Sequence, residues 1–485
     1  MFPQRARCGR LRPVVGTDSS ARIIRAAKQW TGRWTRRRIA GLPIRSLIVF
    51  VLSFGVIEIF EAYFRQYASR GVYFQGWSSE KIMQSVSLRE LRAAPLESLW
   101  YLHVQPPVTN LIRAVIVAFH READWIKVML EVDRDLNHAW ALAGGALAAL
   151  IDAWLRRLRV PGALAALLTL GWLLYPANLA FATLLDGTLL SSLLTTWIVY
   201  ETWKIGRADV GSIGRLSAAV LLAFFTRSIY QWPFVLVMLA SLVLMRVSLR
   251  RLLVFGLVVG LTVGLYSIKQ AYLFGTFSTS TLQGTNLTRS IGADCKGREP
   301  VAAVPRLRLT APVLTERRKL DGTENFNHLD RLNIERGLMA CFRNNLVHRS
   351  TASLLSGYSQ NFDVFLQPSS RYERNALVDR LPWRGPADWI FSGWRLELLV
   401  LCACGLGIWQ TRRHRARFAL AMALPVIYVL AVSVVGESPD NMRFKFFLEP
   451  SLYVLVTCQV LRALRSAIVA GKALAIRGSQ RQLAM

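Results

Sequence analysis

Two acidic residues of this chain stand beside apolar stretches in positions that suit proton transfer. Glu80 follows a pair of serines in YFQGWSSEKIMQ, and Asp186 opens an apolar stretch in LLDGTLLSS. A carboxylate within hydrogen-bond reach of a hydroxyl group can take its proton, so both acids are candidate catalytic residues. A structural interpretation stays open for each. Glu80 suits the first turn of a helix, and Asp186 suits an N-cap over Gly187 and Thr188.

Three basic residues border apolar stretches and are candidate substrate-binding residues. Arg227 lies in FFTRSIYQWPF, and Arg443 and Lys445 lie close together in ESPDNMRFKFFLEP. Arginine binds two phosphate oxygens at once through its planar guanidinium, whereas lysine supplies a compact point charge. We therefore expect these side chains to bind a phosphate or an anionic headgroup. For the segment with Arg443 and Lys445, a plain solvated turn is the alternative.

A histidine and a glutamine precede two consecutive prolines in LHVQPPVTNLI. The prolines favour extended backbone followed by a helix, so we expect His103 and Gln105 on a rigid turn, as substrate-binding residues. A structural histidine is the alternative for His103. Glu58 and Glu61 are further candidates for the base, although they fall inside an apolar stretch, where an acid must face protein or a water-filled cavity.

The motifs of nucleotide and zinc chemistry are missing from the sequence. It has no glycine-rich phosphate loop and no Cys/His spacing typical of a zinc site. We therefore assign no metal ligand and no certain cofactor, and leave a divalent cation open. A substrate already held in the membrane suits the candidate residues better than a nucleotide does.

Long apolar stretches must position these residues. The chain is 53% hydrophobic, and its apolar residues form blocks that match the hydrocarbon thickness of a bilayer. The sequence thus predicts an all-α polytopic membrane protein with about ten transmembrane helices. They are expected at 46–64, 138–155, 161–175, 186–203, 212–227, 231–246, 252–274, 389–410, 417–435 and 446–464.

The charge distribution sets the expected topology. The chain carries 60 Lys and Arg residues against 30 Asp and Glu residues, a formal net charge of +30. No nucleic-acid motif accompanies this charge, so we expect no nucleic-acid partner. In a membrane protein, short cytoplasmic links are rich in Lys and Arg. With both termini in the cytoplasm, the inner links hold Arg156, Arg157, Arg159, Lys204, Arg207, Arg215, Arg246, Arg250, Arg251, Arg412, Arg413, Arg415 and Arg417.

This topology predicts the organisation of the chain. The expected parts are a basic cytoplasmic tail (1–45), a transmembrane module (46–274) with a first extracytoplasmic segment (65–137), an extracytoplasmic subdomain (275–388), C-terminal transmembrane helices (389–464) and a second cytoplasmic tail (465–485). Cys295 and Cys341 are the only cysteines of the subdomain. Because an oxidising compartment favours pairing, we expect a disulfide between them.

In combination, four of these features resemble the GT-C class of membrane glycosyltransferases. The similarity is to the bacterial dolichyl-phosphate-mannose protein mannosyltransferase and lipid A aminoarabinose transferase type. The features are the acid in SSEKIMQ, the element LHVQPPVTNL, the acid in LLDGTLL and the turn ESPDNMRFKFFLEP, in this order along 46–464. Members of that class often have Asp or an Asp-Glu pair where this chain has Ser79 and Glu80, so the identity of the base stays open.

The resemblance implies transfer of a sugar from a polyprenyl-phosphate donor to a hydroxyl on a glycan, a lipid or a protein, with inversion at the anomeric carbon. It implies an active site on the extracytoplasmic face of a cell membrane, in a bacterium the inner membrane, with membrane lipids as further partners. Two alternatives stay open: a transporter or flippase of a lipid-linked glycan, and a non-catalytic assembly subunit.

Overall fold

The structure is a computed structural model that describes residues 38–39, 42–68, 78–207, 212–293, 295, 311–372, 376–396, 414–437 and 441–483. Most of the expected tail at 1–45 and most of the expected span at 389–410 lie outside these residues. Within them the regular secondary structure is helical, apart from two short antiparallel strands, β1 (Arg38–Ile39) and β2 (Leu42–Pro43). The prediction of an all-α protein is therefore confirmed for this part of the chain.

Five helical segments of the described chain are long and apolar enough to cross a membrane. They are α2 (Ile44–Ala68), α6 (Trp125–Arg157), the run of α12 (Leu249–Phe255), η2 (Gly256–Gly260) and α13 (Leu261–Phe274), α21 (His414–Gly436) and α22 (Met442–Leu483). The bent pair α7 (Gly162–Leu173) and α8 (Pro176–Ala182), at 60° to one another, makes a sixth if both belong to one span. Helices of this length and composition indicate a protein embedded in a membrane.

The expected count of about ten spans is not confirmed by the described residues. Three predicted spans correspond to α9 (Thr188–Ile205), α10 (Ser212–Thr226) and α11 (Trp232–Leu244), which do not meet the length and hydropathy of a span. With 13 residues, α11 rises about 20 Å, less than the ~30 Å of a hydrocarbon core. By contrast α9 is buried along most of its length, so it faces protein and not lipid.

Helix α6 starts well before the predicted span at 138–155. It has 33 residues and begins at Trp125, where the side chain of Asp124 accepts the amide N–H of Ile126 as an N-cap. Its polar first half is helical because Val128, Val132 and Leu136 recur every fourth position and are buried.

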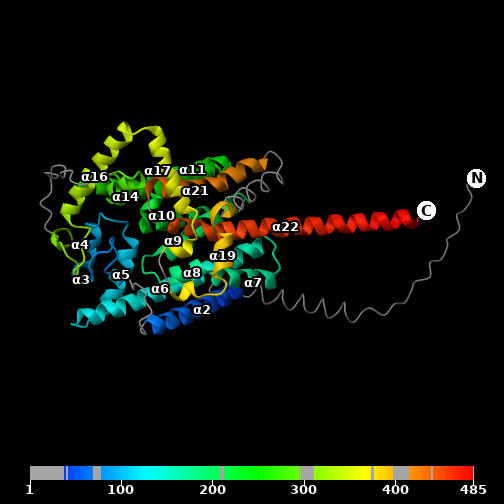
Figure 1. The fold of residues 1–485 in the computed structure, drawn as a ribbon, viewed down its shortest axis with the longest axis horizontal. Coiled ribbons are helices and arrows are strands. Elements are labelled where there is room, and N and C mark those ends of the chain that lie inside the picture. Colours follow the sequence, from blue (N-terminus) through cyan, green and yellow to red (C-terminus); the bar gives the residue numbers. More distant parts are fainter. Residues whose placement is uncertain are drawn as a thin grey trace, which may run out of the picture.

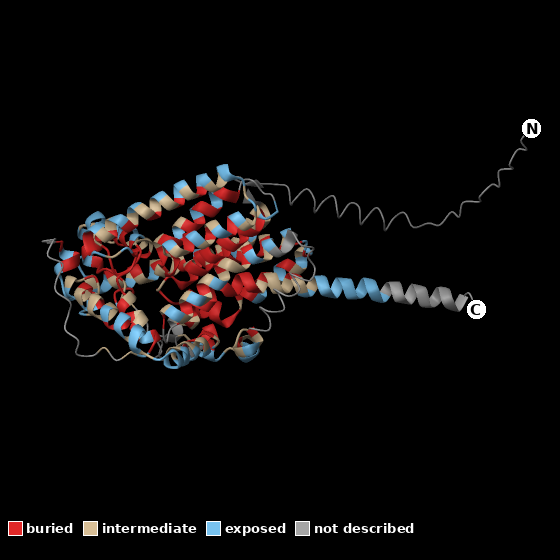
Figure 2. Cartoon of the chain, turned by 90° about the horizontal axis from the view of Figure 1, so that it is seen from above, coloured by how far each residue is buried: buried red, intermediate tan, exposed pale blue. Residues whose placement is uncertain are grey.

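The centre of the bundle is built around α9, which packs against α6, α10 and α22. Figure 2 shows the buried residues gathered through the middle of the body, while residues 462–471 of α22, which project from it, are exposed. Large aromatic side chains fill this centre and are almost fully buried, among them Trp140, Trp154, Trp172 and Phe446.

A group of shorter helices lies at the end of the bundle opposite to the C-terminal end of α22 (Figure 1). It includes α3 (Leu88–Ala93), α4 (Pro95–Trp100), α5 (Val108–Phe119), α14 (Gln283–Ser290) and α16 (Leu329–His348). Here α3 packs on α4 and α5, and α14 packs on α16 and α21. The remaining elements are η1 (Ser228–Tyr230), α15 (Pro312–Thr315), α17 (Thr351–Phe365), η3 (Ser369–Arg371), α18 (Ala376–Asp379) and α19 (Arg384–Ile390).

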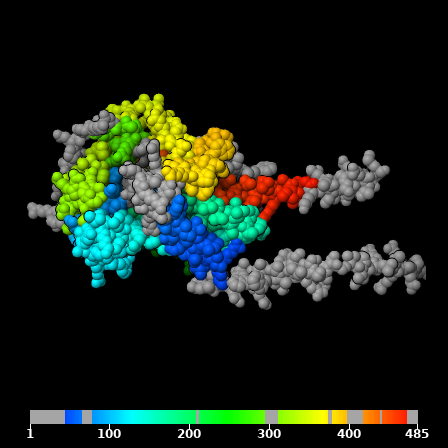
Figure 3. All heavy atoms as spheres, turned by 60° about the horizontal axis from the view of Figure 1, so that its bottom comes forward, coloured from blue at the N-terminus to red at the C-terminus, as the bar shows by residue number. Residues whose placement is uncertain are grey.

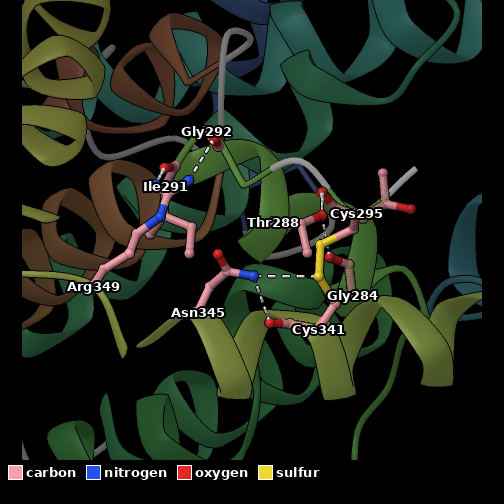
Figure 4. Close-up of a disulfide and its surroundings, with 9 residues drawn as sticks. Gly284, Thr288, Ile291, Gly292, Cys295, Cys341, Asn345 and Arg349 are labelled. Carbon is pink, nitrogen blue, oxygen red and sulfur yellow. Dashed lines mark hydrogen bonds between the residues drawn. A yellow bond between two sulfur atoms is a disulfide. The ribbon is translucent and has the colours of Figure 1, made fainter. Parts of the chain in front are cut away.

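The predicted disulfide between Cys295 and Cys341 is confirmed (Figure 4). Its Cα atoms lie 6.1 Å apart, and it joins the segment after α14 to α16. Asn345, one turn further along α16, donates a hydrogen bond of 2.9 Å from Nδ2 to the carbonyl of Cys341. The guanidinium of Arg349 donates to the carbonyl of Gly292 at 2.9 Å, so a second contact holds the same two segments together.

Candidate functional site

An open cavity of about 730 Å³, counting the space at its mouth, lies where the ends of several helices meet the shorter helices. Charged side chains from five parts of the chain line it: Asp186, Arg227, Arg289, Glu437 and Arg443. Three of these five residues, Asp186, Arg227 and Arg443, are the ones for which the sequence predicts an active-site role.

Asp186 lies in the turn between α8 and α9. This position is compatible with a structural role at the start of α9 and with a catalytic role at the cavity. Its Oδ1 accepts the amide N–H of Thr188 at 2.9 Å, and its Oδ2 accepts the Thr188 hydroxyl at 2.7 Å, so the carboxylate binds the first residue of α9, one position before the N-cap Gly187. Gly187 has a positive φ of 74°, which only glycine adopts without strain and which turns the chain into the helix. The side chain stays partly exposed, because 14% of its surface is accessible.

Two arginines approach the same carboxylate from other elements. Arg227, directly after α10, places a guanidinium nitrogen 3.1 Å from Oδ2 of Asp186 and also donates to the Asp186 carbonyl. Arg443, in the first turn of α22, lies 3.8 Å from the same oxygen and donates a hydrogen bond of 2.7 Å to the Tyr372 hydroxyl. The predictions for Asp186, Arg227 and Arg443 thus meet in one place.

The lining also carries residues that the sequence did not single out as ligands. Asn286 of α14 donates a hydrogen bond of 3.0 Å to Glu437, which lies directly after α21. Arg289, one turn further along α14, is exposed at the cavity. Gln84 lines the cavity too, and its Oε1 accepts a hydrogen bond of 3.4 Å from Arg227. In the sequence, the three-residue spacing of Asn286 and Arg289 is the only pattern that links these two residues, because it places them on one helix face.

The charge of the lining suits an anionic ligand. Three arginines outnumber the two acids, Asp186 and Glu437, by one. A planar guanidinium matches the oxygens of a phosphate or carboxylate, and three of them around one cavity form an anion-binding arrangement. An apolar side made of Ile82, Met83, Leu184, Leu185 and Leu282 completes the lining, so the cavity suits a ligand with both a charged and an apolar part.

Glu80 does not line this cavity. Its side chain is fully buried and lies 3.0 Å from the guanidinium of Arg113, which is fully buried as well. Oε1 of Glu80 also accepts the amide N–H of Leu88 at 2.6 Å, and Lys319 donates to the Glu80 carbonyl. Burial raises the pKa of the Glu80 carboxyl above its ordinary value, and the charge of Arg113 opposes this shift.

Glu80, Arg113 and Lys319 bind the backbone of residues 80–88, part of which lines the cavity. The backbone carbonyl of Val86 accepts a hydrogen bond of 2.5 Å from Arg113, and the Val86 amide donates 3.0 Å to the side chain of Asn110 on α5. Lys319 donates 2.9 Å to the carbonyl of Ile82, which lines the cavity. These contacts are those of a residue that positions the backbone at this wall of the cavity, while the catalytic role of Glu80 stays a prediction.

His103 and Gln105 are buried away from the cavity lining. The Nε2 of His103 lies 2.9 Å from the carbonyl of Asn327, so this nitrogen carries the proton, and Nδ1 accepts the Thr281 hydroxyl at 2.9 Å. Burial lowers the pKa of His103 to about 3, so the ring is neutral. His103 therefore links the segment between α4 and α5 to Thr281 and Asn327, which lie far along the chain, and this agrees with the structural interpretation of the residue.

Lys445, Glu58 and Glu61 also lie outside the lining. The ammonium of Lys445 donates 2.9 Å to the carbonyl of Phe391 and lies 3.8 Å from Glu449, one turn along α22. The Glu58 carboxylate lies 2.7 Å from His138 of α6, and Glu61 is buried on α2. Residues two positions apart on a helix point in different directions, so Arg443 and Lys445 diverge.

One group of metal-ligand type is found among the described residues, and it is not at the cavity. His120, Glu122 and Glu131 bring ligand atoms within 4.8 Å of one another, between α5 and α6. His120 already contacts Glu131 and Asp135, each at 3.0 Å, which satisfies both ring nitrogens. We therefore assign no metal to this group.

No protein-family model matches the chain, and no curated protein or solved structure is significantly similar to it. The residues of the cavity are therefore the basis on which a function is proposed.

Proposed function

We propose that this chain is a membrane glycosyltransferase that moves a sugar from a polyprenyl-phosphate donor to a hydroxyl acceptor. The observation that carries the proposal is the convergence of Asp186 with Arg227 and Arg443 at one open cavity. Such a transfer needs an acid that accepts a proton and cations that stabilise a departing phosphate. The resemblance to GT-C enzymes points to the same chemistry at an extracytoplasmic membrane face.

The proposal includes the GT-C fold and its number of spans. Up to six segments of the described chain have the length and composition of a span. The segment 389–410, together with α9 and the short helices α10 and α11, would bring this number to ten.

In the proposed reaction the acceptor oxygen attacks the anomeric carbon as its proton passes to Asp186. The bond from that carbon to the phosphate oxygen breaks, and its electron pair leaves with the polyprenyl phosphate. Attack opposite to the leaving group inverts the anomeric centre. Arg227 and Arg443 bind the phosphate, whose charge grows as the bond breaks, and stabilise the transition state.

Asp186 is the acid that this proposal needs because it alone, of the four acids considered from the sequence, lines the cavity. Glu80 and Glu58 are paired with Arg113 and His138. The bound phosphate competes with Asp186 for the two guanidinium groups, which leaves the carboxylate available to the acceptor hydroxyl. The apolar side of the cavity suits the first units of the lipid chain of the donor.

The proposal is tested in a deletion strain of the source organism by extracting lipid-linked sugars and comparing them with the wild type. A transferase predicts that an intact polyprenyl-phosphate sugar accumulates and disappears when the wild-type chain is restored, but not when Asp186→Asn is restored. Accumulation confined to the cytoplasmic leaflet would instead indicate a flippase. An unchanged pool of lipid-linked sugars would contradict both.

A further inference from the structure

Helix α5 and its neighbours α4 and α6 carry exposed apolar residues that no described residue covers. On α5 the exposed positions are Leu111, Val115, Ala118 and Phe119, which share one face of the helix. Val115 is 53% exposed and Phe119 is 80% exposed. The helices that pack on α5 expose further large apolar residues: Leu96 and Trp100 on α4, and Ile126 and Leu130 in the first turns of α6.

The other face of α5 is fixed to the body of the protein. Asn110, Arg113, Ala114 and Val117 are buried, and Arg113 forms the ion pair with Glu80. The exposed apolar face is therefore held rigidly outward. In Figure 3 the cyan part of the chain, to which the end of α5 and the start of α6 belong, forms a surface lobe beside α2 in blue.

This face lies near the exposed apolar side of a candidate span. The side chain of Gln270 on α13 donates a hydrogen bond of 3.0 Å to the carbonyl of Leu102, and the Lys269 ammonium lies 5.3 Å from the ring of Trp100. Near these contacts α13 exposes Ile268 and Tyr272, the latter by 81%, in line with Leu261 and Leu265. Trp100 thus lies within about one turn of the end of this span.

We propose that the exposed face of α4, α5 and the first turns of α6 lies in the headgroup and acyl boundary of the lipid bilayer. An amphipathic helix with large apolar residues on one face and a polar, protein-bound opposite face binds a lipid surface in this orientation. Trp100 beside Lys269 at the end of the span matches the aromatic residues that gather at membrane interfaces. The continuity with α13 makes lipid the occupant, because the same layer that covers Ile268 reaches Trp100.

In this arrangement, α5 connects one wall of the cavity to the membrane surface. The buried side of α5 holds Val86 through Asn110 and Arg113. The segment just before Val86 supplies Ile82 and Gln84 to the cavity lining. The bilayer surface and this wall therefore keep a fixed distance from one another. This inference rests on the membrane location of the chain and not on the transfer reaction.

The test is a spin-label accessibility measurement on the full chain in nanodiscs of phosphatidylethanolamine and phosphatidylglycerol. Single cysteines replace Val115 and Phe119 in a background that keeps the disulfide pair and replaces the other cysteines by alanine. Ile268→Cys serves as the lipid reference and Asp330→Cys, on an exposed position of α16, as the water reference. Collisions with oxygen, which concentrates in lipid, are compared with collisions with a water-soluble nickel chelate.

We expect the labels at 115 and 119 to show the high oxygen-to-nickel ratio of Ile268→Cys. A ratio equal to that of Asp330→Cys would place the face in water and overturn the proposal. Low accessibility to both reagents would show that protein, such as a second copy of the chain, covers the face, and would overturn it as well. The measurement requires no catalytic activity, so its failure is distinguishable from failure of the proposed function.

Discussion

Replacement of Glu80 by glutamine separates a positioning role from a catalytic one. The Glu80 carboxylate and the Arg113 guanidinium lie 3.0 Å apart, and both are fully buried. At an effective dielectric constant of about 20, two unit charges at this distance attract by about 5 kcal/mol. This agrees with the ~3–5 kcal/mol lost when one partner of a buried ion pair is removed. Glutamine keeps an oxygen that accepts the Leu88 amide, so the loss arises mainly from the charge.

We therefore expect Glu80→Gln to lower the free energy of unfolding by about 3–5 kcal/mol. The assay is reversible unfolding in mixed micelles of a mild detergent and SDS, followed by tryptophan fluorescence. Glu324→Gln, the same change at an exposed acid, is the matched control and should stay within about 0.5 kcal/mol of the wild type.

The double variant Glu80→Gln/Arg113→Met removes both charges and should recover much of the loss, because no unpaired charge then stays buried. The opposite outcome would be a Glu80→Gln protein as stable as the wild type that binds donor and transfers no sugar. That result would refute the positioning role and return Glu80 to the position of general base.

Three further predictions concern residues outside the cavity. Because the pKa of His103 falls from 6.5 to about 3 on folding, stability is retained above pH 6.5 and lost as the pH falls from 6.5 towards 3. Wild-type protein should therefore lose about 2 kcal/mol between pH 7 and pH 5 in the same assay, and His103→Gln much less. Lys445→Met should destabilise the protein by about 3–5 kcal/mol, because the buried Glu449 carboxylate loses its cationic partner. The KM for the donor, measured on the folded protein, should stay unchanged. Cys341→Ser removes the disulfide, which closes a loop with a sequence separation of 46, and the chain-entropy relation gives a loss of about 4 kcal/mol in the free energy of unfolding. An equal loss on mild reduction of the wild-type protein would support this prediction.

Much of the candidate site could be predicted from the sequence, because its residues border apolar helices. Asp186 precedes α9, Arg227 follows α10, and Arg443 starts α22. Helices that run alternately up and down a bundle bring such ends to one side, so spacing along the chain was enough to group these residues. Arg289 carries no such signal, since α14 is short and lies in a long connecting segment. Glu437 does follow an apolar helix, α21, but no pattern in the sequence distinguishes it from a residue of a solvated turn.

The sequence was less informative for polar residues whose partners are distant in the chain. Glu80 meets Arg113 and Lys319, and His103 meets Asn327, at sequence separations that no local pattern reveals. A buried acid with a cationic partner and a solvated catalytic acid look alike in sequence. Only the fold distinguishes the two, by burial and by the residues that surround each acid.

Local sequence patterns also did not predict where every helix begins. The residues before 138 in α6 contain several acids and basic residues, which favours a loop in a search for apolar spans. Their buried positions recur at helical spacing, and this weaker signal proved to be the correct one, because α6 begins at Trp125.

The most direct test of the account is sugar transfer by purified protein in nanodiscs, with the polyprenyl-phosphate sugar identified from the deletion strain as donor. Asp186→Asn should lose about 10²-fold or more in kcat while it still binds the donor, because it removes the base but keeps the arginines. Asp363→Asn, the same change at an exposed position, should transfer at the wild-type rate. Full transfer by Asp186→Asn would contradict the assignment of the base, and the absence of transfer by the wild-type protein would contradict the proposed function.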